Sequence, residues 1–168
     1  MANVPVDFDK LVENHPDFNA IGQLVNVPSG IETCTVQMSY ALNHAGSPIT
    51  NYEYQDPTLP YDKKTKTNHV RGYRAADNRT YLFSVPDMKV YLNRTYGSAE
   101  NKRGSRANME GLIQNRTGIL AFGHRHIDLW LGDDIHRPHL YKMGYLWNNE
   151  SINLRGIFFW EVTSQWGF

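Results

Sequence analysis

A shortage of cysteine and a lack of net charge set the first limits on this chain. Cys34 is the only cysteine among 168 residues, so no disulfide bond can form within the chain. Lysine plus arginine and aspartate plus glutamate number 17 each, which leaves no excess charge to attract nucleic acid or an anionic membrane. We therefore expect no nucleic-acid partner, and a single thiol that is either a buried apolar group or a reactive one.

Long apolar runs are also missing. No stretch approaches the roughly 20 apolar residues of a membrane-spanning helix, so we expect no membrane insertion. Residues Met1–Lys10 lack a basic segment followed by an apolar run, which indicates a protein made in the cytoplasm without a signal peptide. The length suits one domain over residues 1–168, because a second independent core would be cramped.

The strongest helical pattern covers residues 33–45. Its apolar side chains recur at helical spacing, and they are Cys34, Met38, Ala41, Leu42 and Ala45. Gly46-Ser47-Pro48 ends the helix, and Thr33 is the expected N-cap. The pattern therefore places Cys34 in the first turn of a helix.

The other segments before residue 110 give weaker signals. A short helix is predicted within residues 8–18, stopping near Pro16, and a longer one within residues 84–97. Residues 47–79 show no period, which predicts a long surface loop with one short strand. Residues 98–107 are predicted to form a charged loop.

The last third of the sequence has the patterns of strands. Residues 118–122 are apolar, and residues 126–131 alternate, with His126, Asp128 and Trp130 on one face. Residues 140–146 and 156–163 are further predicted strands. Helices followed by strands indicate the α+β class, with N-terminal helices packed on an antiparallel β-sheet.

Cys34 and His126 form the first candidate site. A thiol is a useful nucleophile only as the thiolate, which a helix N-terminus and a neighbouring imidazolium both favour. Cys34 has the first feature from its place in the helix, and His126 could supply the second if the fold brings the two together. The alternative is that Cys34 packs in the apolar stripe and His126 is an ordinary surface or core histidine.

A run of possible metal ligands is the second candidate site. It consists of His124, His126, Asp133, Asp134, His136 and His139. No HExxH pattern or other specific zinc spacing accompanies these residues, so we expect no metal and no other cofactor.

Three blocks of sequence resemble one protein family. They are Cys34-Thr35-Val36-Gln37-Met38-Ser39-Tyr40-Ala41-Leu42-Asn43, the segment Tyr91–Gly97, and Gly118–Phe122 followed by His126-Ile127-Asp128-Leu129-Trp130 and Gly132. In this order and spacing, over residues 30–135, they resemble the type VI secretion amidase effectors of the fourth family.

The resemblance implies a papain-like, NlpC-type fold and a function in bacterial antagonism. Such an enzyme hydrolyses the γ-D-glutamyl–meso-diaminopimelate bond of peptidoglycan stem peptides, with Cys34 as nucleophile and His126 as base. The type VI secretion machinery would deliver it to the periplasm of a target cell, and a cognate immunity protein would protect the producer. The alternatives are a metal-dependent hydrolase built on the histidine run and a non-catalytic cell-wall-binding module.

The residue that orients His126 is the point where the sequence departs from the family. The family places a polar residue about eleven positions after the histidine, and here that position is Arg137, which has no acceptor. A slightly shorter turn would bring in His136, which we predict as the third catalytic residue. Asp134 is the next candidate, and His139 would need another turn geometry.

Overall fold

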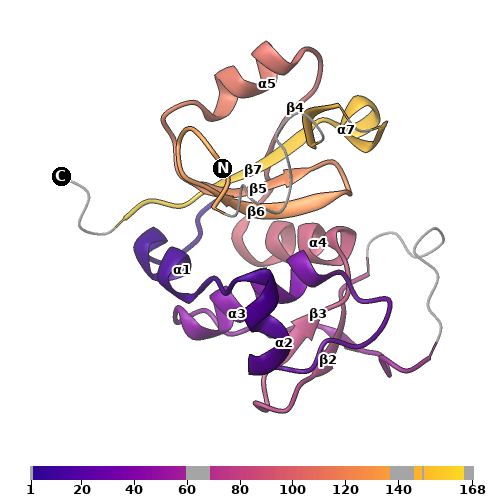
Figure 1. Ribbon diagram of the computed structural model, residues 1–168. Coiled ribbons are helices and arrows are strands. Elements are labelled where there is room, and N and C mark those ends of the chain that lie inside the picture. Colours follow the sequence, from indigo (N-terminus) through magenta and orange to yellow (C-terminus); the bar gives the residue numbers. More distant parts are fainter. Residues whose placement is uncertain (1, 60–68, 137–145, 149, 165–168) are drawn as a thin grey trace.

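The computed structural model describes residues 2–59, 69–136, 146–148 and 150–164. Its centre is a four-stranded antiparallel sheet with helices on both faces (Figure 1). The strands are β4 (Glu100–Lys102), β5 (Gly118–Phe122), β6 (His126–Trp130) and β7 (Ile157–Glu161), in the order β4-β7-β5-β6. Strand β6 is therefore at an edge of the sheet, where a side chain can reach a neighbouring helix.

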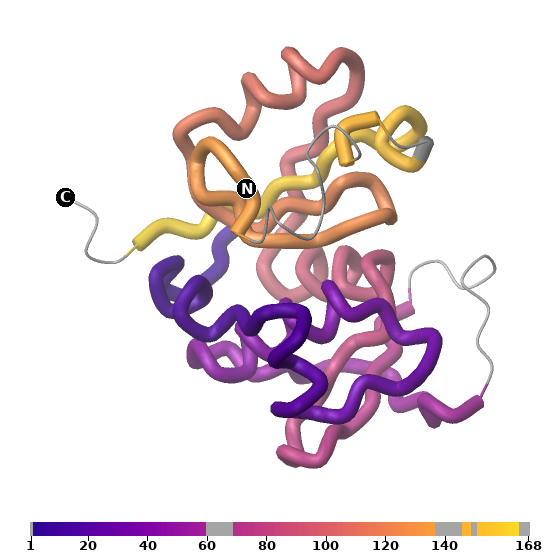
Figure 2. Tube along the Cα trace, viewed as in Figure 1, coloured from indigo at the N-terminus to yellow at the C-terminus, as the bar shows by residue number. Residues whose placement is uncertain are grey.

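The N-terminal helices cover one face of this sheet. They are α1 (Phe8–Asn14), α3 (Thr33–His44) and α4 (Val85–Tyr96), while α2 (Phe18–Leu24) packs against α3 on the side of the second sheet. Helices α5 (Arg106–Ile113) and α7 (Glu150–Arg155) lie on the opposite side (Figure 1). Figure 2 shows the same separation along the chain, with the early residues on one side of the sheet and the late residues in and above it.

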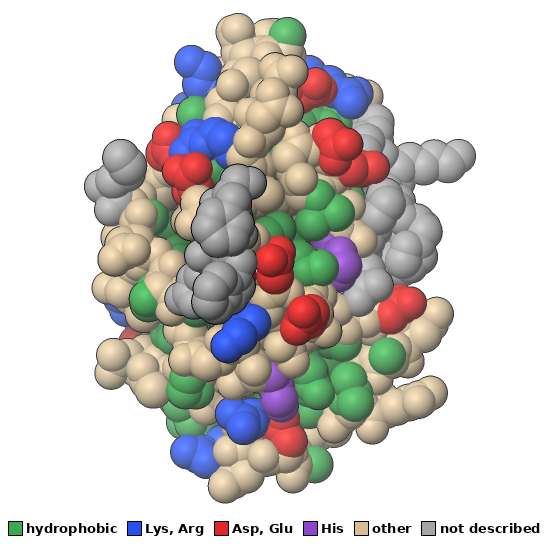
Figure 3. Space-filling view, turned by 90° about the vertical axis from the view of Figure 1, so that its left-hand side faces the viewer, with side chains coloured by type: hydrophobic (Ala, Val, Ile, Leu, Met, Phe, Trp, Pro, Cys, Tyr) green, Lys and Arg blue, Asp and Glu red, His purple; other side chains and the backbone are tan. Residues whose placement is uncertain are grey.

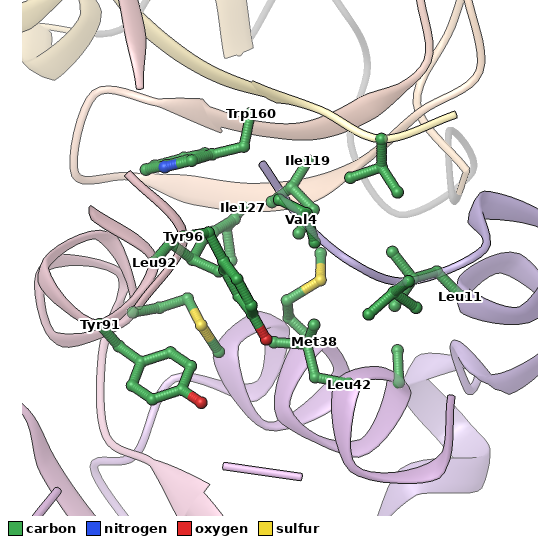
Figure 4. Close-up of a cluster of buried hydrophobic side chains, with 14 of the residues drawn as sticks. Val4, Leu11, Met38, Leu42, Tyr91, Leu92, Tyr96, Ile119, Ile127 and Trp160 are labelled. Carbon is green, nitrogen blue, oxygen red and sulfur yellow. The ribbon is translucent and has the colours of Figure 1, made fainter. Parts of the chain in front are cut away.

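Two apolar layers hold the sheet between the helices. On the α3 and α4 side, Met38, Leu42 and Leu92 pack with Ile119 and Ile127 of the sheet (Figure 4). The other layer, on the α5 and α7 side, contains the buried side chains of Met109, Ile113, Leu120, Phe122, Trp130 and Phe159, among others. Side chains that alternate along a strand thus enter opposite layers, as the pattern of residues 126–131 predicted.

A second, three-stranded sheet lies on the far side of α3. Its strands are β1 (Glu53–Tyr54), β2 (Arg71–Arg74) and β3 (Thr80–Leu82), with β1 parallel and β3 antiparallel to β2. Two polar residues of α3 bind β3 directly. The hydroxyl of Ser39 accepts from the backbone N–H of Leu82 at 3.1 Å, and the amide of Asn43 donates to the carbonyl of Thr80 at 2.8 Å.

The α+β class and the antiparallel sheet are confirmed, and several local predictions are corrected. Helix α2, after Pro16, was not predicted, and the segment predicted as a charged loop contains β4 and the beginning of α5. The N-cap of α3 is Glu32 and not Thr33. Of the strand predicted at residues 140–146, Leu146 is helical and the rest lies outside the described residues.

The surface agrees with the neutral composition. Acidic and basic side chains are interspersed over the face shown in Figure 3, and neither sign covers it alone. None of the helices in the described part of the chain has the length and hydropathy that a membrane crossing needs.

Candidate active site

The beginning of α3 presents the single thiol. Cys34 is the second residue of the helix and is half-buried. The carbonyl of Glu32 accepts the N–H groups of Thr35 and Val36 at 3.0 and 3.2 Å, so the N–H of Cys34 precedes the first helical hydrogen bonds. The thiol therefore lies at the positive end of the helix dipole.

Glu32 fixes this helix start against α4. Its backbone N–H donates to the carbonyl of Phe83 at 3.0 Å, and its carboxylate accepts from the N–H of Val85, the first residue of α4, at 2.6 Å. One residue thus connects the beginnings of two helices, and the position of Cys34 follows from both.

His126 is the second residue that the sequence singled out. It is the first residue of β6 and is 2% exposed, and Cys34 is among the groups that act on its pKa. Burial disfavours its imidazolium, but the hydrogen bonds and charges of Asp128 and Cys34 outweigh burial and raise the pKa of His126 to about 10. The structure therefore brings the two residues that the sequence singled out close enough for Cys34 to act on the pKa of His126, and the surroundings of His126 favour its imidazolium.

Asp128 is the acceptor for the His126 ring. The ring Nε2 lies 3.1 Å from Oδ2 of Asp128, and Oδ1 of the same carboxylate accepts the backbone N–H of Leu129 at 2.7 Å. Burial alone would raise the pKa of Asp128, but the bond to His126 and the nearby charge of His15 hold it below its ordinary value. An ionised carboxylate next to the ring both orients and stabilises the imidazolium.

The residues predicted to orient His126 are placed differently. The backbone N–H of His136 donates to the carbonyl of Leu129 at 2.9 Å, and its ring packs edge-on against the ring of His15. Asp134 accepts from the N–H of Ile135 at 2.8 Å and lines a pocket of about 330 Å³ that does not include Cys34 or His126. The sequence analysis did not predict Asp128 as the orienting residue, although its two-residue spacing from His126 puts both on one face of the strand.

The remaining candidate, His139, lies outside the described residues, as does Arg137, which occupies the family's position for the third residue. Among the residues that the structure describes, no three His, Cys, Asp or Glu side chains form a group that could hold a metal ion. The possible metal ligands His124 and His126 have different partners. The ring of His124 lies 3.0 Å from the ammonium of Lys89, whereas the ring of His126 bonds Asp128.

His124 differs from His126 in its electrostatics. Burial, together with the charges of Lys89 and Arg155, lowers the pKa of His124 to about 4. Burial likewise lowers the pKa of Lys89 to about 7, with Arg155 contributing. The Lys89 ammonium also donates to the carbonyl of Gly123 at 3.2 Å, so this pair connects α4 to the turn that precedes β6.

Comparisons with solved structures agree with this fold. The effector Tae4 of Salmonella typhimurium, solved with the immunity protein Tai4 of Enterobacter cloacae, is 18% identical, with a TM-score of 0.61 over 94% of this chain and 99% of that one. The type VI effector Tae4 of Enterobacter cloacae is also 18% identical, with a TM-score of 0.54 over 97% of this chain and 100% of that one. This likeness confirms the papain-like fold that the sequence resemblance implied.

Sequence comparison gives the family. A comparison of this sequence with curated proteins found no significant match. The model of the family described as type VI secretion system (T6SS), amidase effector protein 4, matches residues 31–160, which include Cys34, His126 and Asp128. Because the match covers well over half of the sequence, the chain belongs to the type VI secretion amidase effector family Tae4.

Proposed function

We propose that this amidase effector is a cysteine-dependent peptidoglycan hydrolase, with Cys34 as nucleophile, His126 as base and Asp128 as the residue that orients His126. The observation that carries the proposal is the hydrogen bond of the buried His126 ring to a buried carboxylate, with Cys34, in the first turn of α3, among the groups that raise the pKa of that ring. Each feature has a direct use in acyl transfer, and membership of an amidase family gives the reaction class.

The mechanism follows from the two ring nitrogens. With Nε2 donating to Asp128, Nδ1 is the nitrogen left to take the thiol proton of Cys34. The thiolate attacks the amide carbonyl, and the N–H of Cys34 at the helix start stabilises the developing oxyanion. His126 then returns a proton to the leaving amine. Water, activated by the same imidazole, hydrolyses the thioester and frees Cys34.

The family resemblance directs the choice of substrate and of biological setting. We propose that the enzyme cleaves the γ-D-glutamyl–meso-diaminopimelate bond of peptidoglycan stem peptides after delivery to the periplasm of a target cell. The effectors of similar fold were solved as complexes with the immunity protein Tai4. We therefore also propose a cognate immunity protein for this chain.

Digestion of purified muropeptides, analysed by mass spectrometry, tests the proposal. Wild-type protein should release products cut at the D-glutamyl–diaminopimelate bond, and Cys34→Ala should release none while keeping a wild-type circular dichroism spectrum. Iodoacetamide should abolish activity, and EDTA should leave it unchanged. Inhibition by EDTA, or activity of Cys34→Ala within about tenfold of wild type, would contradict the thiol mechanism.

A further inference from the structure

His15 is a buried histidine that the proposed mechanism does not use. It is the residue after α1, is 3% exposed, and its backbone N–H donates to the carbonyl of Val12 at 3.3 Å. A histidine buried so fully loses its hydration, and that cost is recovered only where its ring has polar partners. Its surroundings therefore indicate what it does.

The ring of His15 lies against the acidic member of the catalytic group. Its Nε2 is 3.9 Å from Oδ1 of Asp128, and both side chains are buried. The ring of His136, in the segment after β6, also packs edge-on against the ring of His15, with centroids 5.3 Å apart and an interplanar angle of 71°. Asp128 thus has His126 at Oδ2 and His15 on the side of Oδ1.

The loop that carries His15 is bound to the nucleophile helix. The side-chain amide of Gln37, one turn after Cys34 on α3, donates to the carbonyl of Pro16 at 2.9 Å. Asp17 then caps α2, accepting from the N–H of Asn19. His15 is therefore held by the element that carries the thiol while its ring contacts the strand that carries the base.

These contacts point to a single role. We propose that His15 is a positioning residue, which holds the carboxylate of Asp128 in the orientation that bonds His126 and so couples the α3 side of the site to β6. This inference rests on the proposed cysteine mechanism. It adds His15, which follows α1, to the three residues Cys34, His126 and Asp128.

Replacing the ring by apolar and by polar side chains tests this role. His15→Leu fills the space without a donor, whereas the amide of His15→Gln can place an N–H where Nε2 lies. We expect His15→Leu to lower kcat on the order of tenfold with little change in KM, because a misplaced base slows the chemical step. We expect His15→Gln to recover most of the loss. His69→Leu, at an exposed histidine that pairs with Glu53, is the matched control and should equal wild type.

A second measurement needs no substrate. The pKa of His126, followed by NMR of the ring nitrogens, should fall in His15→Leu, since a poorly held carboxylate supports the imidazolium less well. His15→Gln should leave it near the wild-type value. If His15→Leu does not fold, His15→Met, which also has no N–H donor, replaces it.

The outcomes separate this inference from the proposed function. Equal kcat and equal His126 pKa in wild type and the donor-free variant would overturn the role of His15. Equal damage in His15→Leu and His15→Gln would also overturn it, because a donor would then make no difference. Full activity of Cys34→Ala would overturn the proposed function instead, and the NMR titration would still report on His15 and Asp128.

Discussion

His126 and Asp128 lie two residues apart on one edge strand, and the Nε2 of the ring is 3.1 Å from Oδ2 of the carboxylate. Residues at this spacing share a face of a strand, so β6 supplies both the base and its acceptor. The orientation of the His126 ring therefore does not require a residue from beyond the following turn. The family resemblance places the third residue there, and this sequence has Arg137 at that position.

Substitution of three acidic or histidine residues distinguishes the possible orienting groups. We expect Asp128→Asn to lower kcat by about a hundredfold, because a neutral amide neither supports the imidazolium nor fixes its tautomer. His136→Ala and Asp134→Ala should each change kcat by less than about threefold, since the hydrogen bond of His126 goes to Asp128. Steady-state kinetics on a purified stem peptide provide the measurement. A larger loss in His136→Ala than in Asp128→Asn would restore His136 as the orienting residue.

The pH dependence of activity should follow the raised pKa of His126. The folded-state pKa is about 10 and the ordinary value is about 6.5, so the imidazolium persists until the pH rises through about 10. We therefore expect kcat/KM to fall on the alkaline side near pH 10. Asp128→Asn removes a cause of the raised pKa and should move this limb to lower pH. An alkaline limb that is the same in both proteins would contradict the assignment.

The raised pKa of His126 also predicts that the free energy of unfolding falls as the pH rises. Because the folded-state pKa lies above the unfolded value, the contribution of His126 is complete below about pH 6.5 and is lost as the pH rises to about 10. Urea unfolding at several pH values should show a fall in the free energy of unfolding over this range. The fall should be smaller in His126→Ala, and an equal fall would exclude His126 as its source.

His124 and His126 should differ sharply in their effect on catalysis. His124 bonds Lys89 and has a pKa lowered to about 4, so it is neutral near pH 7 and tied to α4. We expect His126→Ala to reduce kcat by a factor of at least about a thousand and His124→Ala by less than about tenfold. Both variants need the same kinetic assay and a circular dichroism control. If His124→Ala is the inactive one, the strand register used for the mechanism is wrong.

The sequence was most informative where a hydrophobic periodicity includes a residue that can take part in chemistry. The apolar stripe from Cys34 to Ala45 predicts α3, and the alternation of residues 126–130 predicts β6, so the thiol and the base could both be placed in advance. Asp128 was within reach of the same reasoning, since it lies on the face of His126. It was missed because the acceptor was sought in the next turn, by analogy with the family.

The rest of the fold depends on contacts that have no local signal. Strands β1, β2 and β3 have two, four and three residues, which is too short for an alternation to be recognised. Their positions depend on Ser39 and Asn43 of α3, whose polar side chains form hydrogen bonds with Leu82 and Thr80. The contact of His15 with Asp128 joins residues far apart in the sequence, so only the folded chain reveals it.

A buried ion pair between the second sheet and α4 gives the last prediction. The backbone N–H and the Nε of Arg71 each donate to Oδ1 of Asp87 at 3.0 Å, and Nη2 donates to Oδ2 at 3.1 Å. Both side chains are almost fully buried, and the hydroxyl of Ser84 also donates to Oδ2. Asp87→Ala should therefore lower the free energy of unfolding by about 3–5 kcal/mol, because it leaves the Arg71 charge buried without its partner.

The matched control for this ion pair is an exposed one. Glu110→Ala breaks the pair between Arg106 and Glu110, whose side chains are both about half exposed, and should cost less than about 1 kcal/mol. Urea unfolding of the two variants at the same pH gives both values. Similar losses for Asp87→Ala and Glu110→Ala would contradict the prediction, because burial would then add nothing to the cost of removing a partner. A large loss for Asp87→Ala alone would establish that Arg71 and Asp87 hold the second sheet against the beginning of α4, the helix to which Glu32 ties the start of α3.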